Sequence, residues 1–168
     1  MTRLASWLLA ALVLCGLAFV AATAGALPPR VATHFGAGGM ANGWMAREGY
    51  VAFALLLQLV LPVMLFLGVG WLPGRLGRFT NLPHREYWLA PPQRPVTLGW
   101  LRGLGATMGC AMALLASGLH AAILDANART PPRLDEPLFL AGLVAFGVVI
   151  VGCVIAMHRR FRRAPREG

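Results

Sequence analysis

Four long runs without a charged residue constrain this chain more than any other feature of its sequence. They cover residues 4–29, 49–74, 103–124 and 137–157. Each run reaches or exceeds the ~20 apolar residues that a helix needs to cross a hydrocarbon core of ~30 Å. We therefore predict an all-α, four-helix transmembrane bundle in one integral membrane domain over residues 1–168, with spans at about 5–26, 50–72, 100–124 and 137–157.

The placement of the basic residues predicts the orientation of this bundle. All fifteen are arginines, and they lie in short loops and a tail beside the spans. Orientation and anionic lipid explain such positions better than a nucleic-acid partner does, in spite of the net charge of +9. If both termini share one side, eleven arginines lie on that side and four on the other. Because basic residues near span ends favour the cytoplasm, we expect both termini to be cytoplasmic.

Both ends of the chain carry a membrane signal. The first span, with Arg3 before it and Ala24-Gly25-Ala26 after it, has some features of a cleavable secretory signal. Its apolar run is longer than the ~7–15 residues of a usual signal peptide, which favours a retained anchor.

The tail is expected to bind anionic lipids at ~1 kcal/mol per basic residue, through Arg159, Arg160, Arg162, Arg163 and Arg166.

Two spans carry features that predict helix packing. Small residues recur at every fourth position of the third span, at Gly105, Gly109, Ala113 and Ser117. Such a strip lets a partner helix approach closely, and we expect that partner within the same chain. In the second span, Gln58 is the one strongly polar side chain. Together with the helix kink expected at Pro62, it is interpreted either as a hinge or polar contact in a path or, preferably, as ordinary bundle packing, in which the amide could hydrogen-bond to a neighbouring helix.

The loop after the first span, about residues 27–49, is expected to be external and folded. Residues 31–35 are compatible with a short extended stretch, the glycines that follow permit a sharp turn, and Asn42-Gly43 is a strong tight-turn dipeptide. We predict that this loop binds an envelope ligand. The candidate residues are His34, Phe35, Gly39, Asn42, Gly43 and Trp44.

These residues carry a family resemblance. The spacing of Pro28, His34-Phe35, Gly39 and Gly43-Trp44 resembles the domain of unknown function 1648, which sits at the start of SdpI-type toxin-immunity membrane proteins and of many small bacterial membrane proteins. Residues 81–91 are similar to a second motif of small members, and the family-like module covers about residues 8–100. The chain departs from the family pattern at Met40, Asn42 and Arg47, where proline, aspartate and lysine are usual. The resemblance implies a bacterial inner-membrane protein of this superfamily.

The loop between the second and third spans, about residues 73–102, is the longest and is expected to be cytoplasmic. Its candidate partner-binding residues are Asn81, Pro83, Tyr87 and Trp88. Aromatic residues between prolines favour two interpretations equally. One is the docking of a cytoplasmic partner, and the other is a linker that lies on the membrane surface.

Catalytic and metal signatures are not evident. The external or near-external titratable residues are His34, His120, Asp125, Asp135 and Glu136. They match no H-E-x-x-H, C-x-x-C or comparable spacing, so we predict neither a metal site nor a cofactor. Asp125 is expected to end its helix. Asp135 and Glu136 are expected at the N-terminus of the fourth span, where the helix dipole favours acids. His120 is expected to lie shallowly enough to reach water.

The sequence thus predicts a non-enzymatic binding, sensing or immunity-like module of the inner membrane. An envelope ligand or a membrane-protein partner would bind at the loops. The first alternative is an accessory subunit that stabilises a larger membrane complex. The second is a small metal-dependent membrane enzyme or transporter.

Overall fold

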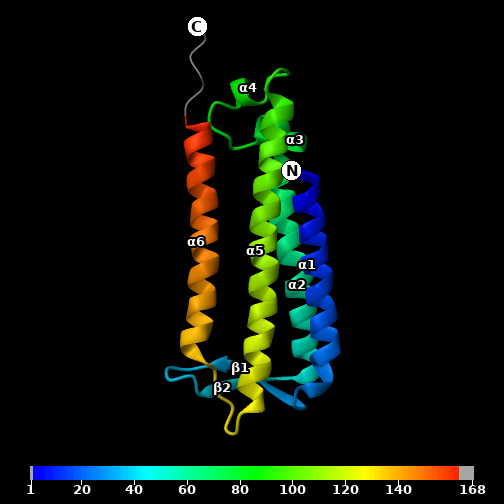
Figure 1. The fold of residues 1–168 in the computed structure, drawn as a ribbon, viewed down its shortest axis with the longest axis vertical. Coiled ribbons are helices and arrows are strands. Elements are labelled where there is room, and N and C mark those ends of the chain that lie inside the picture. The colour runs from blue at the N-terminus through cyan, green and yellow to red at the C-terminus, as the bar shows by residue number, and fades with distance from the viewer. Residues whose placement is uncertain (1, 163–168) are drawn as a thin grey trace.

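Four long helices lie side by side in the computed structural model, which describes residues 2–162 (Figure 1). They are α1 (Thr2–Thr23), α2 (Arg47–Gly70), α5 (Arg94–Ala128) and α6 (Glu136–Phe161). Each is long and apolar enough to cross a membrane by length and composition. The prediction of an all-α bundle with four spans is confirmed. Of the tail arginines, Arg163 and Arg166 lie outside the described residues.

The first residues of α1 and the last residues of α6 lie at one end of the bundle, and a small β-hairpin lies at the other (Figure 1). α5 occupies the centre, where it packs against α1, α2 and α6. It begins six residues before the predicted span, with Pro95 in its first turn, where a missing N–H costs nothing. At 1.5 Å per residue its 35 residues extend over roughly 50 Å, which exceeds the thickness of a hydrocarbon core.

The strip of small residues on α5 faces α2. A Cβ added at Gly105 would lie 2.9 Å from the backbone nitrogen of Gly70 and 3.0 Å from the carbonyl oxygen of Phe66. A Cβ added at Gly109 would lie 2.9 Å from the carbonyl oxygen of Pro62. The two backbones therefore approach so closely that only glycine fits without a shift.

The same strip continues into a polar contact that joins three helices. Ala113 is buried at 1% exposure. One turn further on, the Ser117 hydroxyl donates to Gln58 Oε1 at 3.3 Å, and Gln58 Nε2 donates to the carbonyl oxygen of Leu12 at 3.3 Å. A Cβ at Gly16 would lie 2.0 Å from that Nε2, so the glycine makes room for the amide. Gln58 thus forms the hydrogen bonds to neighbouring helices that its place in an apolar span predicts.

The chain between α1 and α2 forms a short 3-10 turn, η1 (Ala24–Ala26), and then the hairpin of β1 (Arg30–Phe35) and β2 (Ala41–Ala46). The predicted extended stretch is therefore one strand of a two-stranded antiparallel sheet. The prediction of a turn at Asn42-Gly43 is wrong, because both residues lie within β2. The turn is made instead by Gly38 and Gly39, whose φ angles of 81° and 73° suit glycine.

The tip of the hairpin is attached to the segment before α6. Gly39 accepts a hydrogen bond from the backbone N–H of Leu134 at 2.9 Å and donates its own N–H to Glu136 Oε1 at 2.8 Å. Arg133 Nε donates to the carbonyl oxygen of Gly38 at 3.1 Å. Since a Cβ at Gly39 would lie 2.4 Å from the carbonyl oxygen of Leu134, a glycine is required at this contact.

The long loop at the other end contains three short helical segments: α3 (Leu72–Leu76), η2 (Gly77–Phe79) and α4 (Arg85–Trp88). Phe161, at the end of α6, is 1% exposed and packs edge-to-face against Trp88 and Trp100, with ring centroids 5.3 Å apart in each pair. The guanidinium of Arg160 lies 5.1 Å from the Trp100 ring centroid. This aromatic cluster fixes the end of α6 that is remote from the hairpin.

Candidate functional site

A cavity of about 560 Å³ lies beneath the hairpin. Its volume falls within the ~300–1,000 Å³ of typical ligand sites. The walls are mainly apolar, and they come from the hairpin and from three helices. The hairpin contributes residues 33–35 and Met45, α2 contributes Tyr50 and Phe53, α5 contributes His120, and α6 contributes Phe139. Segments distant in the sequence therefore meet around one space near the end of the bundle.

His120 is the buried polar centre of this region, with 2% of its surface exposed. Its Nε2 lies 2.8 Å from the Thr23 hydroxyl of α1, and its Nδ1 lies 2.9 Å from the Tyr50 hydroxyl of α2. The imidazole stacks on the Tyr50 ring at an interplanar angle of 14° and meets the edge of Phe19 at 82°. Both its ring nitrogens thus have partners within the protein, and two aromatic rings pack against the imidazole.

These contacts assign the proton on the imidazole. The Thr23 hydroxyl has a single proton, which it donates to the carbonyl oxygen of Phe19 at 2.7 Å. Its oxygen is then the acceptor for the Nε2–H of His120. The remaining ring nitrogen, Nδ1, accepts from the Tyr50 hydroxyl. A neutral imidazole therefore satisfies all its partners, as a group within an apolar span requires.

The expectation that His120 lies shallowly enough to reach water is wrong. The side chain turns inward between α1 and α2, because hydroxyl partners there satisfy both nitrogens. Neither His120 nor its partners Thr23 and Tyr50 were among the candidate binding residues. One signal marks this site in the sequence: a single histidine within a run that has no charged residue.

The hairpin brings together most of the candidates from the first loop. His34 Nδ1 contacts Asn42 Oδ1 across the two strands. Gly43 stands opposite His34, and a Cβ there would lie 2.9 Å from the Cβ of His34. His34 and Phe35 line the cavity, whereas Trp44, 47% exposed, does not. Gly39 serves the attachment of the turn and not the cavity.

Asn127 holds the hairpin to α5, and sequence reasoning missed it. Its Oδ1 accepts from the backbone N–H of Ala32 at 2.8 Å, and its Nδ2 donates to the carbonyl oxygen of the same residue at 3.0 Å. The side-chain amide pairs with β1 as the backbone of a third strand would. It thereby satisfies a strand edge that lies at the end of the bundle, where Ala32 is fully buried.

The candidates of the long loop do not meet the cavity. Asn81 and Pro83 are exposed, and Tyr87 is half-buried. Trp88 belongs to the aromatic cluster with Phe161. Trp88 thus has a packing role within the chain, at the end of the bundle opposite to the hairpin (Figure 1).

The acidic residues near the hairpin have structural contacts. Asp125 forms an ion pair with Arg129 at 2.6 Å, and Asp135 caps α6 by accepting from the backbone N–H of Leu138 at 3.2 Å. Within residues 2–162, no group of three or more histidine, cysteine, aspartate or glutamate side chains is placed to hold a metal ion.

Comparison with known proteins identifies one part of the chain. Residues 11–58 match the family model of the domain of unknown function DUF1648. The resemblance is confirmed over this segment, which runs from α1 through the hairpin to Gln58 of α2. The second motif, at residues 81–91, lies outside the match. No match was found among curated proteins or among solved structures.

Proposed function

We propose that this multi-pass membrane protein is a non-enzymatic binding module that recognises an envelope ligand beneath its hairpin. The supporting observation is the cavity of about 560 Å³ that the hairpin covers. Its walls come from the segment that matches DUF1648 and from α5 and α6, so a ligand there would contact three of the four long helices. A bound ligand would also contact the hairpin, whose tip is fixed to the start of α6.

The lining of the cavity favours an amphipathic ligand, such as part of a membrane-active peptide. The phenyl rings of Phe35, Phe53 and Phe139 offer apolar surface, and the exposed His34 offers a polar contact toward water. The cavity lies near a helix end, where the polar and apolar zones of a membrane meet. A peptide that inserts from the aqueous phase would present both kinds of surface at this depth.

The proposed setting is a bacterial inner membrane with the hairpin outside and both termini in the cytoplasm. The arginine distribution supports this orientation. Arg159 and Arg162 are exposed at the cytoplasmic end in this arrangement and would contact anionic lipid headgroups. Alkaline phosphatase inserted at Gly38 should be active, and the same enzyme fused after the tail should be inactive. The reverse pattern would refute the orientation.

The binding function is tested by resistance to membrane-active peptides. A host strain that lacks the gene should be more sensitive to at least one cationic amphipathic peptide of a defined panel, and the wild-type gene should restore resistance. His34→Ala/Phe35→Ala removes two side chains from the cavity wall and should fail to restore it. Trp44→Ala is the matched control, because it removes an aromatic side chain of the same hairpin that does not line the cavity.

Two outcomes would contradict this proposal. One is unchanged sensitivity of the deletion strain to every peptide of the panel. The other is full complementation by the His34→Ala/Phe35→Ala variant at an expression level equal to that of the wild type. Equal loss of resistance in the Trp44→Ala strain would place the effect in the hairpin as a whole and not in the cavity.

An accessory-subunit role is the second candidate, and the packing of α6 favours it. Among the long helices, α6 packs mainly against α5, and only 6% of the residues in its most apolar stretch are buried. Cysteine crosslinking from Val144 and Val151, both exposed on α6, would capture a stoichiometric membrane partner if this role holds. Labelling by lipid-soluble reagents without any crosslinked protein would exclude it.

A further inference from the structure

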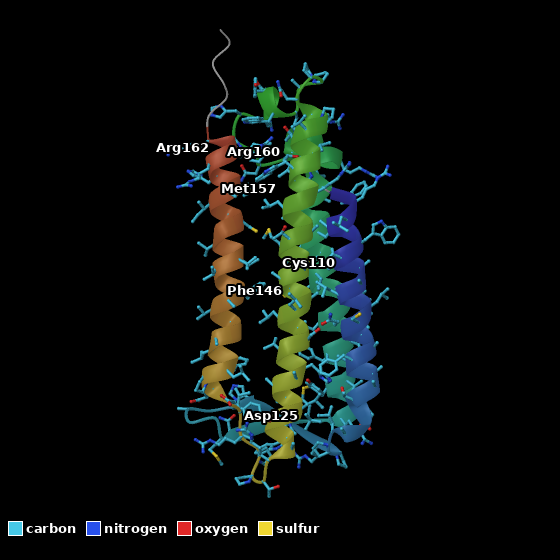
Figure 2. All side chains as sticks on the ribbon, in the orientation of Figure 1. Cys110, Asp125, Phe146, Met157, Arg160 and Arg162 are labelled. Atoms are coloured by element: carbon cyan, nitrogen blue, oxygen red, sulfur yellow. The ribbon has the colours of Figure 1, made fainter. Side chains whose placement is uncertain are left out.

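A second space opens between α5 and α6 on the flank of the bundle. It is an apolar groove of about 700 Å³ that extends from the middle of the two helices to the hairpin end. The labelled Asp125 and Phe146 lie along it (Figure 2). The groove and the cavity beneath the hairpin share Leu119, Ala122 and Phe139 as walls, but the groove extends further along α6, to Val149.

α6 is attached to the rest of the protein at both of its ends, and the groove lies between these attachments. At the hairpin end, Glu136 accepts from the backbone N–H of Gly39. At the other end, Phe161 packs into its aromatic cluster. Between these contacts the walls contain small residues, among them Gly118 and Gly142, and a Cβ at either position would meet no atom within 4 Å. Glycines on both helices therefore leave room in this part of the interface.

The position of the groove restricts what fills it. It lies within segments that are apolar enough to cross a membrane, so the surrounding medium is lipid and an empty volume of this size would forfeit dispersion contacts. Its walls expose almost no polar atom except at the hairpin end, where Asp125 and Asp135 line it. An acyl chain fits the apolar part, and its headgroup would meet these two carboxylates.

Charge at the mouth of the groove selects the headgroup. Two carboxylates lie there with one arginine, Arg129, which is 2.6 Å from Asp125 and 3.9 Å from Asp135. The other nearby arginine, Arg133, directs its Nε to the carbonyl oxygen of Gly38. A zwitterionic headgroup complements this arrangement, with its ammonium on the carboxylates and its phosphate near Arg129. An anionic headgroup without an amine would bring no cation to the two carboxylates.

We propose that the groove between α5 and α6 is a phospholipid site that takes one acyl chain and prefers an ethanolamine headgroup, held by Asp125 and Asp135 in the leaflet at the hairpin end. The site adjoins the cavity beneath the hairpin but does not depend on the function proposed for that cavity. Its occupant fills the space between α5 and α6.

The test uses the full chain, reconstituted in nanodiscs that contain equal amounts of phosphatidylethanolamine and phosphatidylglycerol and released into the gas phase for native mass spectrometry. The wild type should retain one phosphatidylethanolamine. Gly142→Leu places a side chain in the groove and should reduce this retention by about ten-fold. Gly147→Leu is the matched control, since Gly147 is equally open on the same helix but does not line the groove; it should retain the lipid.

Two further variants keep the test decisive. Gly118→Leu fills the groove from α5 and gives the same result if Gly142→Leu fails to fold. Asp125→Asn/Asp135→Asn removes both charges, while asparagine still serves as a helix cap. This variant should lose the ethanolamine preference by about five-fold, equivalent to the ~1 kcal/mol of an exposed ion pair, and still retain a lipid.

Three results would overturn the proposal. The first is a wild-type protein that retains no lipid or prefers phosphatidylglycerol. The second is equal retention by the Gly142→Leu and Gly147→Leu variants. The third is a lipid-free dimer whose interface is lost on Gly142→Leu, because a second copy of the chain would then fill the groove.

Discussion

The packing of α5 on α2 predicts a sharp difference between two glycines of one helix. A methyl group at Gly105 would lie 2.9 Å from the backbone nitrogen of Gly70 and 3.0 Å from the carbonyl oxygen of Phe66, and neither backbone atom can move aside alone. At Gly103, two residues earlier, the same methyl group would meet no atom within 4 Å. Both alanine substitutions gain the same helix propensity, at most ~1 kcal/mol. Only the substitution at Gly105 overpacks the contact between α5 and α2.

Overpacking of a well-filled contact costs ~1–3 kcal/mol. We therefore expect Gly103→Ala to leave the protein equally or slightly more stable, and Gly105→Ala to be less stable than Gly103→Ala by that amount. At ~2–4 °C per kcal/mol for a chain of this length, the difference in apparent Tm should be several degrees. Gly109→Ala, which approaches the carbonyl oxygen of Pro62, should behave like Gly105→Ala.

The assay is thermal unfolding of the purified protein in one mild detergent, followed by far-UV circular dichroism at one scan rate, since the apparent Tm of irreversible unfolding depends on that rate. Equal shifts for the Gly103→Ala and Gly105→Ala variants would refute the reasoning, because the contact with α2 would then not limit the size of the residue. A destabilised Gly103→Ala variant would show that α5 has a partner on a face that is open in the monomer.

Three further perturbations test other contacts. His120→Leu and Tyr50→Phe each leave a buried polar partner without a hydrogen bond, at ~1–3 kcal/mol; the double variant should lose less apparent Tm than the two single losses combined. Gly39→Ala should increase amide hydrogen exchange in the hairpin turn much more than Gly38→Ala does. Both glycines have positive φ, but only Gly39 lies against the backbone of Leu134. Phe161→Ala should cost ~3–5 kcal/mol and raise quenching of tryptophan fluorescence by iodide, because it removes the centre of the aromatic cluster; unchanged quenching would contradict that role.

Hydropathy predicted the spans because, in a membrane, it reports the medium in which each segment lies. Hydropathy did not predict the start of α5, where the helix extends beyond its apolar run. The first turns of α5, from Arg94 to Gly99, are too polar to be read as a span, yet the helix continues through them because Pro95 suits a first turn and the following residues permit a helix. Pattern alone could not separate a helix that extends beyond the bilayer from the loop that it replaces.

The hairpin was only partly predictable because its pairing depends on distant residues. β2 has a single aromatic residue, Trp44, and no β-branched residue, so its propensity for a strand is weak. β1 is held by Asn127, 95 residues away from Ala32. The Asn42-Gly43 dipeptide has the local signature of a turn, but Asn42 contacts His34 across the strands instead. Tertiary contacts therefore overruled a local preference.

The buried polar site shows the same limit more strongly. Thr23 and His120 lie 97 residues apart, and Tyr50 and His120 lie 70 apart. Each is unremarkable in its own segment: a threonine at a helix end, a tyrosine near an interface, and a histidine near another interface. Their function as a hydrogen-bonded set exists only once three helices have assembled, and no spacing in one sequence encodes it.

The boundary of the DUF1648 match gives these contacts a further meaning. The matched segment, residues 11–58, supplies one partner of each contact that defines the site: Thr23 and Tyr50 for His120, and Gln58 for Ser117. The other partner comes each time from α5, which lies beyond the match. Left alone, the matched segment would leave Gln58 Oε1 and the Tyr50 hydroxyl in lipid without these partners, at a cost of several kcal/mol. The segment is therefore half of a structural unit, and α5 completes it with His120 Nδ1 as acceptor for the Tyr50 hydroxyl, the Ser117 hydroxyl as donor to Gln58, and one wall of the cavity.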